Sequence, residues 1–166
     1  MTTQSTIATA QHAIIDGLVD CEMLIAELYH AYGVLFPEVG SFWIAIGHEE
    51  ETHARLLLEL HTYLDHGHVF FNIGKFNQES LQPVRARIEG CVRAARSGKI
   101  ALRDALFAAC SIENSVMDAR FYDTVTSNSP DFQRVAEALS KSTEGHVSAI
   151  QNMLTAVINE GGRKEA

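Results

Sequence analysis

The sequence predicts an all-α protein, and three observations carry that prediction. Apolar residues recur every three or four positions over long stretches, no segment keeps the alternation of a β-strand, and only three of the 166 residues are proline. Hydrophobic residues make up 46% of the chain, close to the average for a globular domain. We therefore expect one helical domain covering residues 1–166.

The first predicted hairpin consists of two long helices separated by a tight turn. The apolar period runs from about Ala8 to Phe36 and resumes from about Phe42 to Asp65. The segment between them, FPEVGS, contains proline and glycine, which are typical of turns.

A connection without a regular period follows, at residues 66–80 (HGHVFFNIGKFNQES). Ser80 is expected to cap a short extra helix that tolerates Pro83 in its first turn and ends at Gly98. The last two helices are expected at about Lys99–Val125 and Asp131–Asn159, with the tail EGGRKEA beyond them. Two hairpins joined by a long connection predict a four-helix bundle.

The net charge of −8 argues against nucleic acid and anionic membrane surfaces as partners. No apolar run is long enough to span a bilayer, and the first residues lack the pattern of a secretory signal. The cysteines, Cys21, Cys91 and Cys110, are widely spaced and odd in number. A disulfide framework is therefore not expected, and we expect a cytoplasmic protein.

Polar residues can be placed relative to each apolar stripe, because an α-helix turns about 100° per residue. In the first helix, Glu22 lies on the apolar face with Leu18 and Ile25, whereas Glu27 falls on the opposite side. Tyr29 shares the apolar face, so we expect it to pack in the core with its hydroxyl near the site, and a role in redox chemistry is the alternative.

The stretch HEEETHARLL, residues 48–57, contains three consecutive glutamates. Glu50 and His53 continue the apolar stripe of the second helix, Glu51 lies nearly opposite, and Glu49 is at the margin. The simpler alternative is a solvated charged face that happens to contain a histidine, but the wheel argues against it.

The second predicted hairpin repeats this anomaly. Glu113 lies near the centre of one apolar stripe, and Thr143 and His146 lie in the other. Three pairs of identical residues also recur at an offset of 93 positions, namely Tyr29 and Tyr122, Pro37 and Pro130, and His53 and His146. This offset indicates either an internal repeat or only the symmetry of a bundle.

A buried carboxylate is unfavourable unless it is paired, hydrogen-bonded or bound to a metal. Carboxylate oxygen and imidazole nitrogen are suitable ligands for iron, manganese or zinc. The candidate metal ligands are Glu22, Glu50, His53, Glu113 and His146. A buried ion pair, or a core histidine that is merely hydrogen-bonded, is the alternative for each.

With these residues the chain resembles the ferritin-like superfamily, and most closely its rubrerythrin-like branch. The strongest stretch is CEMLIAELYHAYGVLFPEVGSFWIAIGHEEETHARLL, where Glu22, Tyr29 and the Glu50-x-x-His53 pair follow the pattern of that group. The resemblance implies two metal ions, with iron expected and manganese or zinc as alternatives. Glu22 with His53 would hold one ion, Glu113 with His146 the other, and Glu50 would bridge them.

The same resemblance implies an oxidoreductase that reacts with peroxide or dioxygen, or a protein that handles iron. Rubrerythrins also carry a small iron domain with paired CxxC motifs, which this chain lacks, so a separate electron donor would be needed. We expect the chain to form a homodimer.

Two positions depart from the pattern. Thr143 stands where the family has a second bridging glutamate, so one ion is an alternative to two. Arg120 lies on the same face as Glu113 and could pair with a carboxylate in place of a metal. A non-catalytic, metal-free bundle that acts through protein–protein interaction is therefore the alternative function.

Overall fold

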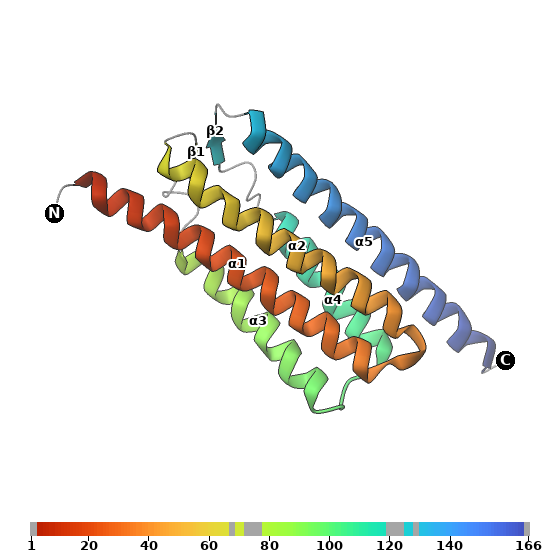
Figure 1. Ribbon diagram of the computed structural model, residues 1–166. Helices are drawn as coiled ribbons and strands as arrows, with labels where there is room; N and C mark the ends of the chain where they lie inside the picture. The colour runs from red at the N-terminus through yellow and green to blue at the C-terminus, as the bar shows by residue number, and fades with distance from the viewer. Residues whose placement is uncertain (1–2, 67–68, 72–77, 119–124, 128–129, 165–166) are drawn as a thin grey trace.

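The computed structural model describes residues 3–66, 69–71, 78–118, 125–127 and 130–164, and helices dominate them (Figure 1). The helices are α1 (Thr3–Leu35), α2 (Gly40–Asp65), α3 (Gln78–Arg96), α4 (Leu102–Asp118) and α5 (Pro130–Lys164). A short 3₁₀ turn, η1 (Pro37–Val39), joins α1 to α2, and two short strands are β1 (Val69–Phe71) and β2 (Val125–Ser127). The predicted all-α class is confirmed.

The helices α1 and α2 form a long antiparallel hairpin that lies along the centre of the molecule (Figure 1). Two buried glycines allow the helices to approach closely at the turn. A Cβ atom on Gly40 would lie only 2.8 Å from the carbonyl oxygen of Gly33, so a larger residue at position 40 would force the backbones apart. The turn also closes with a hydrogen bond from Val39 N to Phe36 O.

Helix α3 packs along α1 and is not the short helix that the sequence predicts. It has 19 residues, whereas α4 has 17. The helix includes Ser80, so Ser80 does not cap it. Pro83 lies inside α3 and has no N–H to donate to the carbonyl of Glu79, four residues earlier. Both residues are exposed, so water can bond to that carbonyl and the helix tolerates the proline.

The second hairpin, α4 and α5, differs from the prediction where α4 ends and where α5 ends. Val125 was expected in a helix but lies in β2, where it pairs with Phe71 of β1 in an antiparallel register. Valine and phenylalanine favour strands, and three residues are too few to show a strand period in the sequence. Helix α5 runs past Asn159 through two glycines to Lys164, since glycine costs only about 1 kcal/mol in a helix.

The apolar core runs between the helices and is filled by large side chains. Trp43, Tyr29 and Tyr32 are fully buried and pack ring against ring near the α1–α2 turn. Leu57 and Leu60 are buried further along α2.

None of the described helices has a stretch apolar and long enough to cross a membrane. The three cysteines are free.

Candidate metal centre

All five predicted ligands are buried within this core. Their relative exposures range from 2% to 8%, and the side chains come from α1, α2, α4 and α5. They are Glu22, Glu50, His53, Glu113 and His146. The helical wheel therefore identified the buried polar positions correctly, and it did so because burial follows the helical period.

Glu50, His53 and His146 form the centre of this group, and a ligand atom from each lies within 4.8 Å of the other two. His53 Nδ1 lies 2.9 Å from Glu50 Oε2, and His146 Nδ1 lies 2.7 Å from Glu50 Oε1. Each oxygen of the Glu50 carboxylate thus faces a different histidine. The two imidazole rings stack with their centroids 5.3 Å apart.

The contact between Glu50 Oε1 and His146 Nδ1 is close but does not have hydrogen-bond geometry. Both atoms are buried, and neither has a hydrogen-bond partner among the described residues. The two atoms nevertheless form a buried ion pair, so each has an electrostatic partner. An ion bound between the carboxylate and the imidazoles would take the place of the His146 proton, so the residues present fit a metal.

Glu113 lies at the edge of this trio. Its Oε1 is 3.9 Å from His146 Nδ1 and accepts a hydrogen bond of 2.5 Å from the Tyr29 hydroxyl. Burial, followed by the charge of Glu50, raises the pKa of Glu113 to about 8. Tyr29 itself is fully buried, so its expected place in the core with its hydroxyl near the site is confirmed.

Glu22 adjoins Glu50 from α1. Burial raises the pKa of Glu22 well above its ordinary value, and the neighbouring Glu50 carboxylate raises it further. Without a metal, Glu113 therefore holds a proton at neutral pH, and the raised pKa of Glu22 favours its protonated form as well. Metal binding at either carboxylate would release that proton.

Glu50 and His146 behave as an ion pair in the absence of a metal. Burial alone would raise the pKa of Glu50, but its contacts with His146 and His53 outweigh burial and lower it to about 2. Burial alone would lower the pKa of His146, but the Glu50 carboxylate outweighs it and raises that pKa to about 9. The negative Glu50 and the positive His146 balance each other.

Glu49 was placed only at the margin of the helix face, and its contact with the site was not predicted. Its side chain is 58% exposed, yet its Oε2 accepts a hydrogen bond of 2.9 Å from His146 Nε2. A histidine that binds a metal commonly donates its other ring nitrogen to a carboxylate, which fixes the orientation of the ring. Glu49 is suited to that role for His146.

The two departures from the family pattern have different outcomes. Thr143 is buried, and its hydroxyl donates to the carbonyl of Leu139 on its own helix at 3.1 Å. This position therefore contributes a hydroxyl turned back to its own helix and no carboxylate. Arg120 lies outside the described residues, as does Tyr122 of the repeat.

The remaining pairs of the 93-residue offset occupy related places. Pro37 begins η1 and Pro130 begins α5, while His53 and His146 meet at the site.

Comparison of the chain with protein-family models, curated proteins and solved structures found no match. The candidate site therefore rests on its own residues and their geometry.

Proposed function

We propose that this chain is a ferritin-like metal protein that holds one iron ion on Glu50, His53 and His146. The observation that carries the proposal is the buried cluster of Glu50, His53 and His146, in which a ligand atom from each residue lies within 4.8 Å of the other two. A set of two imidazoles and one carboxylate suits iron, and also manganese or zinc.

The carboxylates that flank the trio are the ligands left for a second ion. Glu50 lies between the two histidines, which is the bridging place that the ferritin-like resemblance implies. Glu22 and Glu113 are the remaining ligands, and Thr143 supplies no second bridge. We propose one ion on the central trio, where the Glu50 carboxylate is already charged and only the His146 imidazolium has to give up a proton.

Iron bound at such a centre supplies redox chemistry with peroxide or dioxygen. The surrounding residues would hold the ion, keep bulk water out and manage protons. Glu113, with a pKa of about 8, is suited to hold or release a proton near neutral pH, and Tyr29 orients its carboxyl group. The proposal includes a separate electron donor and a homodimer, as the resemblance implies.

Metal content tests the proposal directly. Untagged protein loaded anaerobically with Fe(II) and then desalted should contain about one iron per chain by inductively coupled plasma mass spectrometry. The Glu50→Gln variant keeps the shape of the side chain but removes its charge, and it should lose nearly all of that iron. Glu144→Gln changes an exposed glutamate two positions before His146 and should leave the iron content unchanged.

Each other outcome has a distinct meaning. Two irons per chain in the wild type, both lost in Glu50→Gln, would replace the single ion with a bridged pair. Equal iron content in the wild type and Glu50→Gln would show that the site assignment is wrong.

A metal-free bundle that acts through its surface is the second candidate, and the charge balance of the site favours it. The charges of Glu50 and His146 balance each other, and burial raises the pKa of both Glu22 and Glu113, which favours their neutral forms. Protein that takes up no iron, manganese or zinc would support this candidate over the metal protein.

A further inference from the structure

A second group of metal-binding side chains lies outside the buried core, on another side of α2. His30 of α1 faces His48 and Glu51 of α2, and a ligand atom from each lies within 4.8 Å of the other two. His48 Nδ1 is 3.2 Å from Glu51 Oε2, and His30 Nδ1 is 3.9 Å from Glu51 Oε1. The side chains are between 32% and 64% exposed, so an ion could reach them from solvent.

Gly47 leaves room for the His30 ring in this group. A Cβ atom at position 47 would lie 2.8 Å from His30 Nε2, so a larger residue there would make the ring shift from its place against α2. His30 Nε2 is buried there and has no hydrogen-bond partner among the described residues. The other nitrogen, Nδ1, is consequently the one that faces Glu51 and is available as a ligand.

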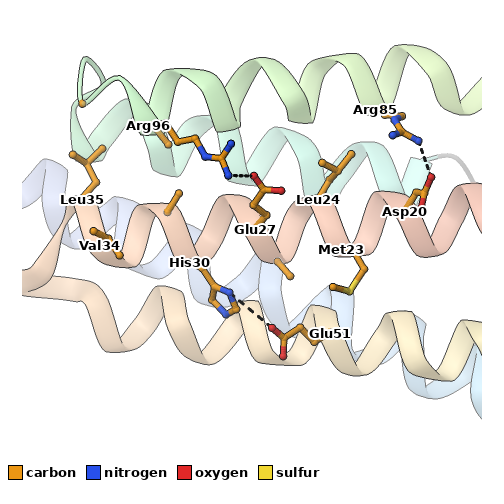
Figure 2. A pocket seen from close by; sticks show the side chains of 14 residues that line it. Asp20, Met23, Leu24, Glu27, His30, Val34, Leu35, Glu51, Arg85 and Arg96 are labelled. Carbon is orange, nitrogen blue, oxygen red and sulfur yellow. Dashed lines mark hydrogen bonds and ion pairs between the residues drawn. The ribbon is translucent and has the colours of Figure 1, made fainter.

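Two members of the group also line a surface pocket of about 920 Å³ over α1, between α2 and α3. Figure 2 shows His30 and Glu51 facing each other across this pocket, with Met23 and Val34 nearby on α1. On the α3 side, Arg96 pairs with Glu27, so that carboxylate is already engaged. The pocket gives small molecules access to the His30–Glu51 side of the group.

We propose that His30, His48 and Glu51 form a second metal site, at the surface, for a divalent ion of the zinc class. Two imidazole nitrogens and a carboxylate oxygen match the ligand set of open zinc sites, which keep a fourth position for water. Ligands bound at 2.0–2.1 Å in a tetrahedron lie about 3.3 Å apart, and the 3.2 Å from His48 Nδ1 to Glu51 Oε2 is close to that value. His30 Nδ1 is 3.9 Å from the other oxygen, Oε1, so an ion would draw His30 closer to the carboxylate.

An ordinary surface pair between His48 and Glu51, three residues apart on one helix, accounts for only part of this geometry. It does not account for His30, which comes from the other helix and turns Nδ1 toward the same carboxylate. The T-shaped contact between the two imidazoles, with centroids 5.1 Å apart, brings a third ligand to the pair.

Zinc binding by equilibrium dialysis tests this site. His48→Ala removes a side chain that is 64% exposed, so the variant should fold. We expect it to lose one equivalent of Zn²⁺ or to bind that ion at least tenfold more weakly. His66→Ala removes an exposed histidine just beyond the end of α2 and should bind zinc as the wild type does.

The test is independent of the buried centre. Glu50→Gln should retain the zinc equivalent that His48→Ala loses, whether or not iron binds in the core. X-ray absorption of zinc-loaded Glu50→Gln protein should show two imidazole ligands on the ion. Identical zinc stoichiometry and affinity in the wild type and His48→Ala would overturn the proposal.

Discussion

The two hairpins place a histidine at related points of the core but surround it differently. In α2, His53 follows Glu50 by three residues, and both side chains point inward. In α5, His146 follows Thr143 by three residues, and the threonine hydroxyl bonds to its own helix. His146 therefore takes its two closest carboxylate contacts from α2, through Glu50 on one ring nitrogen and Glu49 on the other, while Glu113 of α4 lies farther away, at 3.9 Å.

This asymmetry shows how one carboxylate can serve two helices. Glu50 presents one oxygen to each histidine, so the second hairpin reaches the centre through a residue of the first. The α5 side consequently depends on the packing of α5 against α2. Changes at positions 143, 146, 29 and 49 test how far that dependence extends.

The largest effect is expected from Thr143→Glu, which makes the two hairpins alike. A fourth carboxylate in the buried site has no cation to balance it, so the metal-free variant should lose about 3–5 kcal/mol of unfolding free energy near pH 8. Added Fe(II) should recover much of that loss, and the iron content should rise towards two ions per chain. Chemical denaturation with and without iron measures both effects.

Thr143→Gln is the matched control, because glutamine has nearly the same size as glutamate without its charge. A loss of stability shared equally by both variants would show that size, and not charge, limits position 143. In that case the asymmetry of the hairpins would concern packing and not metal binding.

The next effect concerns the pH dependence of the metal-free protein. The pKa of Glu113 rises from 4.5 to about 8 on folding, so its contribution to stability is complete below pH 4.5 and is lost as pH rises through 8. The pKa of His146 rises from 6.5 to about 9, so its contribution is lost between those values. Together the two groups should lower the unfolding free energy by on the order of 6 kcal/mol from pH 6 to pH 9.

Metal should reverse that trend, because raising the pH removes protons that compete with the ion. Thermal unfolding followed by circular dichroism, with and without Fe(II), gives both curves. His146→Gln should remove part of the slope between pH 6.5 and 9 in the metal-free protein. A metal-free stability that rises through this range would contradict the protonation states assigned to Glu113 and His146.

Helical periodicity predicted the buried site well but could not reveal contacts between helices. It placed Glu22, Glu50 and Glu113 inward, because a buried face repeats with the turn of the helix. It left Glu49 at the margin, since only the approach of α5 brings His146 Nε2 to that carboxylate. In the same way, His30 falls on the outer face of α1, and nothing within α1 indicates that it meets His48.

The boundaries of the elements were predicted less well than their existence. Val125 was assigned to a helix because a strand of three residues shows no period, and its pairing with Phe71 depends on a segment far away in the chain. The start of α3 was placed too late, because Pro83 was expected in the first turn. Neither error moved a site residue, since the ligands lie in the middle of their helices.

A smaller effect is expected from Tyr29→Phe. The variant loses the hydrogen bond from the Tyr29 hydroxyl to Glu113, which should cost about 1–2 kcal/mol of unfolding free energy. It should also raise the pKa of Glu113 further, since that bond favours the charged carboxylate. Urea unfolding at several pH values measures both changes.

Tyr32→Phe is the control for Tyr29→Phe. Tyr32 is equally buried, but its hydroxyl has no hydrogen-bond partner among the described residues. Its removal should therefore leave stability unchanged or slightly increased. Similar losses in both variants would mean that the Tyr29–Glu113 contact adds nothing beyond packing.

The smallest effect on the fold, with a clear effect on binding, is expected from Glu49→Ala. The Glu49 side chain is 58% exposed, so its removal should change the unfolding free energy little. It should, however, release His146 Nε2 and let the ring turn away from Glu50, which should weaken iron binding about tenfold. Glu59→Ala, at another exposed glutamate of α2, should leave iron affinity unchanged. If both variants bind iron as the wild type does, the orientation of His146 is set by Glu50 and core packing alone, and α5 does not depend on this outer carboxylate.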